Sequence, residues 1–397
     1  MPNITIQNSE NNYSSLAFLN KKSIEEIRLS LLNWFDLNGR HWIPWKLNSY
    51  GKLPKEDENL CIYSIFVAEV MLQQTQLKVV LPYWCEWMKT FPSLEDLAYA
   101  DISKILLLWQ GLGYYSRARR IHESSKILAK LIDINQSLDL PSWPKDINIW
   151  MKLPGIGKST AGSILSSAFN LPEPLLDSNV KRIISRLFGL KKPVIKNTSQ
   201  LWSLSNLLLD YESPRRFNQA LMDLGATICT SRSPICNLCP LNPFCFAYNF
   251  GSPQDFPIKT RSRALPKVII GIGLILNNHG QVLIDQRLDE GTMGGMWEFP
   301  GGKQEKGESI QITIARELYE ELGIDVIVGE NLIEFDHSYS HKELHFVVHF
   351  CELVSGEPKP LSSSQVKWVK IEELSKYPFP AANKKMIDAL KKYLINK

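Results

Sequence analysis

Residues 153 to 161 read Leu153-Pro154-Gly155-Ile156-Gly157-Lys158-Ser159-Thr160-Ala161 and join a tight turn directly to the start of a helix. The two glycines can adopt backbone conformations that are closed to residues with a Cβ atom. Backbone N–H groups in the first turn of a helix lack partners within the helix and can bind a phosphate oxygen. The stretch therefore predicts two helices joined by a phosphate-contacting turn. Because Gly-x-Gly turns also occur in proteins that bind no phosphate, other features must decide.

The sequence on both sides of this turn is helical. Between about residues 23 and 248, apolar residues recur at spacings of three and four, and Pro or Gly separates the segments. The clearest predicted helices cover residues 24 to 35, 64 to 73, 102 to 109 and 116 to 131. This part of the chain is predicted to be all-α.

The pattern changes after residue 250. Residues 251 to 267, GSPQDFPIKTRSRALPK, contain three prolines and four basic residues without apolar periodicity, which is typical of a linker. Strands are predicted at 268–276, 281–286, 345–353 and 366–370, and helices at 310–322 and 383–394. The fold class is therefore two domains, all-α and then α+β. The predicted divisions are an Asn- and Ser-rich disordered tail (1–22), a helical domain (23–250), a linker (251–267) and a mixed domain (268–397).

The length and composition agree with two folded domains. The chain has 397 residues, more than the roughly 250 to 300 at which a single core stops growing. No apolar run approaches the about 18 residues of a membrane-spanning helix, and the first 22 residues lack the apolar core of a secretion signal. Residues 268–397 hold 14 Lys and Arg against 19 Asp and Glu, whereas the remainder holds 31 against 22. A basic half is compatible with a polyanionic partner and equally with a solvated surface of mixed charge.

Four of the seven cysteines lie within 17 residues: Cys229, Cys236, Cys239 and Cys245. In a chain without an export signal, such a cluster favours a metal site over disulfides. Structural zinc sites usually pair two Cys-x-x-Cys knuckles across a longer loop, and that pattern is absent from this sequence. The spacing of six, two and five residues fits an iron–sulfur cluster better.

Two carboxylates are candidates for catalysis. Asp177 follows Gly157 by 20 residues, and an aspartate in such a place is by itself more often a helix cap. Glu69 lies among apolar helix residues, where a carboxyl group stays protonated near neutral pH unless it is paired. A glutamate at the edge of a core helix is the alternative interpretation. A protonated glutamate of this kind suits a general acid.

Together these motifs resemble the endonuclease III superfamily of DNA glycosylases, with its helix-hairpin-helix, downstream aspartate and cysteine loop. The segments Glu69-Val70-Met71-Leu72-Gln73-Gln74-Thr75-Gln76, 111–119 (GLGYYSRAR) and 217–225 (FNQALMDLG) resemble the adenine-specific MutY-type members. The resemblance implies that the four cysteines hold a 4Fe-4S cluster and makes Arg232 a candidate phosphate contact. Bifunctional glycosylase-lyases carry a nucleophilic lysine where this chain has Ser159, which implies a monofunctional enzyme.

The resemblance also implies the residues that contact DNA. Gln74 and Tyr114 would wedge into the duplex, and Trp45 and Gln219 would line the pocket for the flipped adenine. Further DNA-binding residues would be Thr75, Gly155, Gly157, Ser159 and Asn179. In the implied chemistry, Glu69 donates a proton to N7 of adenine, and the ionised Asp177 stabilises the cationic sugar or bonds to it transiently. Extruding the base costs a few kcal/mol, which the wedge residues help to offset.

Residues 302–324 fill every fixed position of a Nudix hydrolase box: Gly302, Glu308, Arg316, Glu317, Glu320, Glu321 and Gly323. On a helix, Glu317, Glu320 and Glu321 share one face, where three carboxylates can hold magnesium against a pyrophosphate. A solvated acidic helix face is the alternative interpretation. MutY-type C-terminal domains share this fold but lack an intact box. The loop 335–341 resembles the one with which that family recognises 8-oxoguanine, which implicates Tyr339, Ser340 and His341.

The expected function is therefore base excision of adenine opposite 8-oxoguanine in double-stranded DNA by a monomeric, cytoplasmic, nucleoid-associated protein. Its C-terminal domain is expected to read 8-oxoguanine, with 8-oxo-dGTP and Mg²⁺ as candidate ligands of the box. One alternative is a glycosylase-lyase of the endonuclease III type, which Ser159 disfavours. A second is a Nudix pyrophosphohydrolase with a DNA-binding helical module, which the presence of both Glu69 and Asp177 disfavours.

Overall fold

The computed structural model of the chain describes residues 21–138, 143–259, 266–291, 293–339 and 342–395. Its contacts separate two compact units. The first contains residues up to 73 and residues 132–261, and the second contains residues 74–131 and 262–397. Residues 1–20 of the predicted tail and 260–265 of the predicted linker lie outside the described part of the chain.

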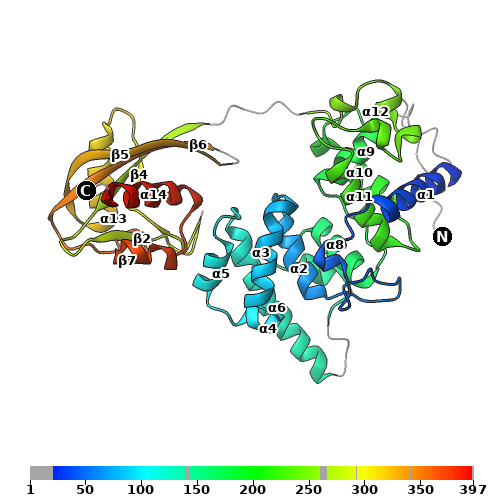
Figure 1. Ribbon diagram of the computed structural model, residues 1–397, viewed down its shortest axis with the longest axis horizontal. Coiled ribbons are helices and arrows are strands. Elements are labelled where there is room, and N and C mark those ends of the chain that lie inside the picture. Colours follow the sequence, from blue (N-terminus) through cyan, green and yellow to red (C-terminus); the bar gives the residue numbers. More distant parts are fainter. Residues whose placement is uncertain (1–20, 139–142, 260–265, 292, 340–341, 396–397) are drawn as a thin grey trace. The chain divides into compact units, whose positions relative to one another are not determined.

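The first unit is helical (Figure 1). Its longer helices are α1 (Lys21–Asn38), α2 (Ile62–Leu72), α8 (Lys158–Phe169), α9 (Ser178–Leu187), α10 (Thr198–Leu208) and α11 (Pro214–Thr227). The shorter ones are η2 (Pro44–Lys46), α7 (Ile147–Met151), η3 (Val194–Asn197), η4 (Cys236–Leu238), η5 (Asn242–Phe244), α12 (Phe246–Asn249) and η6 (Pro253–Asp255).

Two groups of helices carry the core of this unit. Helix α1 buries Ile27, Leu31 and Phe35 at a spacing of four residues and packs with α9, α10 and α11. Helix α2 is apolar on all sides, and nine of its eleven residues are buried. It packs against α8. An α-helix that is apolar all round must lie inside the protein, so the partly exposed Glu69 in α2 is an exception that needs a reason.

The second unit begins with helices α3 (Leu77–Thr90), α4 (Leu94–Ala98), α5 (Ile102–Trp109) and the part of α6 (Ser116–Ser137) that ends at residue 131. Helix α4 begins with a capping box between Ser93 and Asp96. Trp87 and Trp109 from α3 and α5 are fully buried, with ring centroids 5.5 Å apart.

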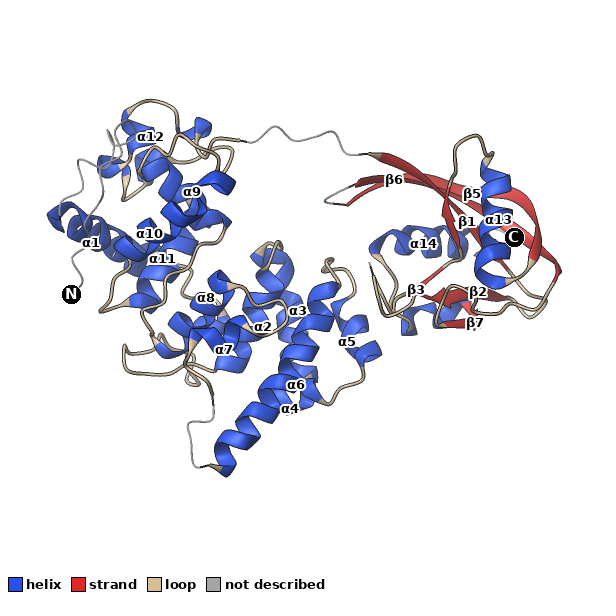
Figure 2. Ribbon diagram, turned by 180° about the vertical axis from the view of Figure 1, so that it is seen from behind, coloured by secondary structure: helices blue, strands red, loops and turns tan. Residues whose placement is uncertain are grey.

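The remainder of the second unit is a mixed α/β domain (Figure 2). One sheet has the order β4-β1-β6-β5 and the other has the order β3-β2-β7. The strands are β1 (Lys267–Ile275), β2 (Gln281–Gln286), β3 (Trp297–Glu298), β4 (Gly301–Lys303), β5 (Asp325–Tyr339), β6 (Lys342–Ser355) and β7 (Gln365–Lys370). Strands β1 and β6 are parallel, and every other pair is antiparallel.

Helices α13 (Ile310–Leu322) and α14 (Ala381–Ile395) pack against these strands, and the short helix η7 (Ile371–Lys376) follows β7. Helix α13 lies close to β1, where the strand has Gly271 and Gly273. A Cβ atom on these two residues would lie 2.8 and 2.9 Å from Ile314 and Leu318 of α13. The two glycines therefore allow the box helix to approach the sheet.

The predicted fold class, an all-α half followed by an α+β half, is confirmed. Helix α5 has the predicted bounds, while α1 begins at Lys21, two residues before the predicted start of the domain. The prediction missed strands β3, β4 and β5. Among the described residues, no helix has the length and apolar character needed to span a bilayer.

Candidate active site

Glu69 and Asp177 are two partly exposed carboxylates of the first unit. The pKa of Glu69 is raised to about 7, mainly by burial. The hydroxyl of Ser163 and the charge of Lys46 lower this pKa, and the charge of Asp177 raises it. A large fraction of Glu69 therefore carries a proton at neutral pH, as a general acid requires.

Ser163 lies on α8 and faces Glu69. Its hydroxyl is buried and makes no hydrogen bond of good geometry with another described residue. Its influence on the Glu69 pKa nevertheless places the two groups next to each other. The hydroxyl is therefore available to the Glu69 carboxyl or to a molecule that enters the site.

Asp177 is the N-cap of α9. One of its oxygens accepts a hydrogen bond from Val180 N at 2.7 Å, and the other accepts one from Asn179 Nδ2 at 3.1 Å. Burial raises the pKa of Asp177, and these hydrogen bonds and the charge of Arg182 oppose that rise. Donated hydrogen bonds stabilise the ionised form. Burial therefore raises the pKa of both carboxyl groups, and the hydrogen bonds and Arg182 favour the ionised form of Asp177.

The predicted turn precedes α8. Gly155 has a φ of +78° and Gly157 is the N-cap of the helix. Gln73, at the end of α2, donates from Nε2 to Gly155 O at 3.1 Å and to Thr160 Oγ1 at 3.2 Å. These bonds hold the turn against the helix that carries Glu69, so the predicted phosphate-contacting turn and the candidate acid are directly connected.

Ser159 has an internal role in the structure. Its hydroxyl accepts a hydrogen bond from Leu176 N at 2.9 Å, which fixes the segment just before Asp177. The Lys158 ammonium lies 4.5 Å from the centroid of the Trp202 ring. The only lysine beside position 159 is therefore engaged by an aromatic ring. A contact of Ser159 with DNA stays a prediction.

Asn179 and Arg182 connect Asp177 with the cysteine loop. Arg182 donates to Asn179 Oδ1 at 2.9 Å, to Gly225 O at 2.7 Å and to Cys229 O at 2.7 Å. The sequence prediction named Asn179 as a DNA contact and gave Arg182 no role. Their spacing of three residues on one helix was the available signal.

Cys229, Cys236, Cys239 and Cys245 line one pocket together with Arg186. Arg186 is 2% exposed and donates to Cys229 Sγ at 3.3 Å and to the carbonyl oxygens of Thr230 and Ser231. Burial raises the pKa of the Cys239 thiol to about 12. Binding to a metal deprotonates such thiols, and an all-sulfur donor set beside a guanidinium group fits an iron–sulfur cluster.

The geometry of this pocket is not that of a preformed single-ion site. Among the residues that the structure describes, no three Cys, His, Asp or Glu side chains are grouped so that they can hold one metal ion. Arg232 of the same loop is exposed, as a phosphate contact would require. Its contact with DNA stays a prediction.

Trp45 and Gln219, the predicted lining of the base pocket, are 6% and 5% exposed. Next to them in sequence and along α11 lie two charged residues that the sequence prediction missed, Lys46 and Asp223. The Lys46 ammonium lies 2.9 and 3.1 Å from the two carboxylate oxygens of Asp223. A lysine directly after the run 41–45, which contains no Lys, Arg, Asp or Glu, was the only signal in the sequence.

The predicted wedge residues belong to the second unit. Gln74 and Tyr114 have φ angles of 60° and 48°. Such left-handed conformations are uncommon without glycine and often mark functional sites. Arg117 donates to Thr75 Oγ1 at 3.0 Å and to Gly113 O at 3.0 Å, and thereby ties the two turns together. Tyr114 is 42% exposed.

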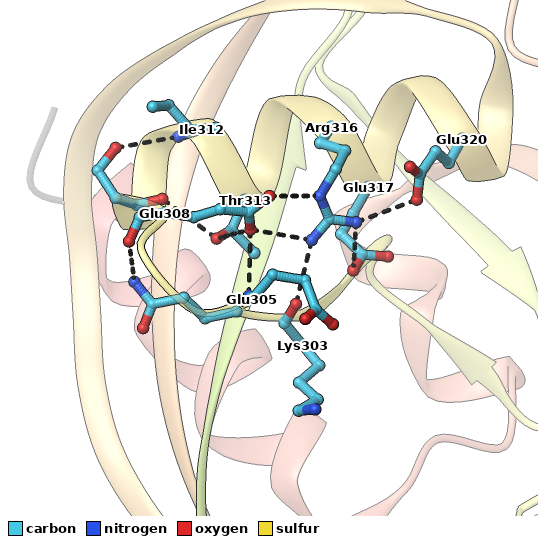
Figure 3. A network of polar contacts seen from close by, with 10 residues as sticks. Lys303, Glu305, Glu308, Ile312, Thr313, Arg316, Glu317 and Glu320 are labelled. Atoms are coloured by element: carbon cyan, nitrogen blue, oxygen red, sulfur yellow. Dashed lines mark hydrogen bonds and ion pairs between the residues drawn. The ribbon is translucent and has the colours of Figure 1, made fainter.

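The Nudix box surrounds Arg316 (Figure 3). This guanidinium donates to Glu308 Oε1 at 2.8 Å, to Glu317 Oε1 at 3.0 Å and to Glu320 Oε2 at 3.0 Å. Glu321 accepts a hydrogen bond from Gly301 N at 3.2 Å, and its pKa is raised to about 7, mainly by burial. The three predicted metal ligands lie on α13 at the spacing of one helix face, but among the described residues they are not grouped closely enough to hold one metal ion, so metal binding stays a prediction.

Two further carboxylates of this domain were missed by the sequence prediction. Asp285 on β2 and Glu298 on β3 are directly opposite each other in the sheet. Burial, and then the charges of Glu298 and Glu321, raise the pKa of Asp285 to about 8. Neither residue belongs to the box. The register of the strands places them near it, since the charge of Glu321 acts on Asp285.

Tyr339 ends β5, and burial raises the pKa of its phenol to about 12. Its ring packs against that of His337 at a centroid distance of 4.7 Å. Ser340 and His341, the other two predicted 8-oxoguanine contacts, lie outside the described residues.

Known proteins resemble both halves of the chain. Residues 67–205 match the family model of the HhH-GPD superfamily base excision DNA repair proteins, and residues 271–389 match that of the NUDIX domain. The chain is 32% identical over 317 residues to the adenine DNA glycosylase of Buchnera aphidicola subsp. Acyrthosiphon pisum (strain APS), covering 79% of this chain and 83% of that protein.

Two further similarities extend the comparison. Identity to the adenine DNA glycosylase of Homo sapiens is 30% over 432 residues, covering 96% of this chain and 77% of that protein. A solved structure of a thermostable thymine-DNA glycosylase superposes with a TM-score of 0.48 at 25% identity, covering 58% of this chain and 98% of that one.

Proposed function

This chain belongs to the adenine DNA glycosylase family, and we propose that it removes adenine from pairs with 8-oxoguanine by acid-assisted cleavage of the N-glycosidic bond. It is a DNA glycosylase of base excision repair, and DNA is its partner. The observation that carries the proposed mechanism is a carboxyl group with a pKa of about 7, Glu69, near a second carboxyl group, Asp177, that accepts two hydrogen bonds favouring its ionised form.

Adenine is a poor leaving group until one of its ring nitrogens is protonated. Glu69 gives its proton to N7, so that the O–H bond breaks and an N–H bond forms. The bond between N9 and the anomeric carbon then breaks, and its electron pair goes to the base. Asp177 stays ionised and stabilises the positive charge that develops on the sugar. Water completes the hydrolysis.

The reaction stops at an abasic site. A lyase needs an amine that attacks the sugar, and position 159 holds a serine whose hydroxyl is bonded to Leu176 N. The neighbouring Lys158 is held over Trp202. These contacts support a monofunctional glycosylase over a bifunctional glycosylase-lyase.

Substrate recognition divides between the two parts of the chain. Trp45 and Gln219 line the pocket of the flipped adenine, and Gln74 and Tyr114 fill the gap in the duplex. The left-handed backbone of Gln74 and Tyr114 supports this role. Tyr339, Ser340 and His341 read 8-oxoguanine. Thr75, Gly155, Gly157, Ser159 and Asn179 complete the proposed DNA contacts.

The four cysteines hold a 4Fe-4S cluster in this proposal. The pocket that the four thiols share and the adjoining Arg186 guanidinium support that assignment. The cluster would supply no step of the hydrolysis. It would shape the loop that presents Arg232 to DNA.

Single-turnover cleavage of duplexes with adenine opposite 8-oxoguanine, guanine or cytosine tests this proposal. We expect the fastest release opposite 8-oxoguanine, slower release opposite guanine and little release opposite cytosine. Product strands should break only after alkali or heat. Equal rates with all three duplexes would contradict the proposed 8-oxoguanine specificity and leave adenine release itself intact.

A second activity is supported by the complete Nudix box: Mg²⁺-dependent hydrolysis of 8-oxo-dGTP to its monophosphate. Arg316 orients Glu317 and Glu320, and Gly301 N holds Glu321. Three carboxylates on one helix face have no use in reading a neutral base within DNA, whereas they suit a cation that binds phosphates.

A further inference from the structure

Two buried charged groups, Lys46 and Asp223, form one network with the partly exposed Arg40 beside the proposed base pocket. Asp223 accepts two hydrogen bonds from Lys46 Nζ, at 2.9 and 3.1 Å. It accepts three more from Arg40, at 2.7 Å from the backbone N, 2.9 Å from Nε and 2.6 Å from NH2. The Asp223 side chain is 1% exposed and that of Lys46 is 6% exposed. Charges in such a place are weakly screened by solvent.

The network carries more positive than negative charge. Burial raises the pKa of Asp223, but the charges of Lys46 and Arg40 and the hydrogen bonds lower it below its usual value. One ionised carboxylate thus faces two cations. The pKa of Lys46 is lowered on balance, mainly by burial, and the charge and hydrogen bonds of Asp223 oppose that effect and favour the ammonium form. About one positive charge is left over to act on neighbouring groups.

Glu69 is such a neighbour. Lys46 belongs to η2, which packs against α2, the helix of Glu69. Lys46 lowers the pKa of Glu69, and Glu69 raises that of Lys46. The other groups that act on Glu69 are the Ser163 hydroxyl from α8 and the Asp177 carboxylate at the start of α9. Among these groups, Lys46 is the one cation.

We propose that Lys46 is a positioning residue for glycosidic cleavage: held by Asp223, its ammonium stabilises the carboxylate that Glu69 becomes when its proton passes to the base. The inference rests on the proposed role of Glu69 as general acid. The O–H bond of Glu69 breaks in that step, and a negative charge appears on a buried group. A fixed cation beside this charge lowers the energy of the transition state without moving during the reaction.

Burial therefore raises the pKa of Glu69, whereas the charge of Lys46 lowers it. Burial keeps the carboxyl protonated up to about neutral pH. Lys46 keeps it from becoming so weak an acid that proton transfer slows, because the best general acid has a pKa near the working pH. Asp223 holds the ammonium in place and neutralises enough charge to keep two cations inside the fold.

The test is the pH dependence of single-turnover adenine release by the full chain carrying Lys46→Gln. Glutamine can still donate a hydrogen bond to Asp223 but has no charge. We expect the pH above which the rate falls to rise by about one unit. The maximal rate should fall roughly tenfold or more, and duplex binding should persist. Lys46→Arg keeps the charge, so in this variant the rate should fall above the same pH as in the wild type.

Arg216→Gln is the matched control. Arg216 also pairs with a carboxylate, at 2.6 Å from Asp36, but its side chain is 38% exposed. Removing its charge should not change the pH above which the rate of adenine release falls. Lys46→Met is a second neutral variant, which guards against a fold defect specific to glutamine.

The outcomes separate the two proposals. Both neutral variants could instead release adenine more slowly at every pH, with no change in the pH above which the rate falls. That result would overturn the role of Lys46 and leave Glu69 as the acid. Adenine release by Glu69→Gln at the wild-type rate would overturn the role of Glu69, and the inference about Lys46 with it. If the pH above which the rate falls is shifted in the Gln and Met variants but not in Lys46→Arg, the roles of Lys46 and Glu69 are both supported.

Discussion

The guanidinium group of Arg182 donates a hydrogen bond of 2.7 Å to the backbone carbonyl oxygen of Cys229. The same side chain bonds to Asn179, whose amide bonds to Asp177. The first cysteine of the loop and Asp177, the proposed stabilising carboxylate, are therefore joined through two side chains of one helix. Changes in the cysteine loop have a direct route to the geometry of the active site.

Replacing Arg182 by Met is expected to impair both stability and catalysis. The change leaves the carbonyl oxygens of Gly225 and Cys229 without their donor, at a cost of about 1–3 kcal/mol. Thermal unfolding and single-turnover adenine release measure the two effects. Wild-type release by a protein of lowered stability would show that the connection supports the fold alone. Arg216→Met is the control, since its ion pair is exposed and such pairs contribute about 0–1 kcal/mol.

Glu69→Gln and Asp177→Asn are each expected to abolish adenine release while binding to a duplex with adenine opposite 8-oxoguanine persists. Both changes remove interactions that are made only in the transition state. Binding is measured by fluorescence anisotropy.

Wild-type protein should give no borohydride-trapped covalent adduct, because no amine occupies position 159. An adduct that forms at the rate of base release would contradict the monofunctional mechanism.

The same Glu69→Gln change is expected to stabilise the protein at alkaline pH. The folded-state pKa of Glu69, about 7, lies above the usual 4.5. The folded protein thus binds this proton more tightly than the unfolded chain does, and stability falls as pH rises from about 4.5 to about 7. Glutamine removes that loss. At pH 8 the variant should gain about 1–3 kcal/mol over wild type, after allowance for the partial exposure of the side chain, and little at pH 4.

Part of this site was accessible from the sequence alone. Asp177 follows a glycine turn and Glu69 interrupts an apolar run, so the chemical abnormality of each is visible in the sequence. Lys46, Asp223 and Arg182 were not predicted, because their roles depend on contacts between segments more than 40 residues apart, such as Arg182 and Gly225. Asp285 and Glu298 meet only through the strand register.

The fold shows a similar division. Helix α5 has strong apolar periodicity and was predicted with its observed bounds. Strand β5 was missed because four acidic residues, Asp325, Glu330, Glu334 and Asp336, lower its apolar content and Gly329 interrupts it. Register shifts near Val328 and Asn331 break its alternation further. Pairing with β6 stabilises a strand that its own composition does not favour.

Protein purified without air is expected to be yellow-brown, with about four irons and four sulfides per chain. Cys239→Ser should lower the iron content and the thermal stability, because it removes one of the four sulfur atoms that line the pocket. Cys85→Ser is the control, since Cys85 is exposed. Iron is measured by plasma emission and absorbance. Stoichiometric zinc in place of iron would contradict the cluster.

The full chain is expected to release pyrophosphate from 8-oxo-dGTP when Mg²⁺ is present. Beside an anionic substrate, the carboxylates of α13 would repel phosphates unless a cation lay between them. Arg316 fixes Glu317 and Glu320 through hydrogen bonds of 3.0 Å, so two of the three ligands are held before a cation binds. The double change Glu320→Gln with Glu321→Gln should abolish turnover. Glu352→Gln with Glu357→Gln, which removes two exposed carboxylates of the same domain, should not.

Adenine release from DNA should persist in the box variant, since the acid and the stabilising carboxylate lie in the first unit. If wild-type protein shows no turnover above the box variant, the domain binds 8-oxoguanine without hydrolysing the nucleotide.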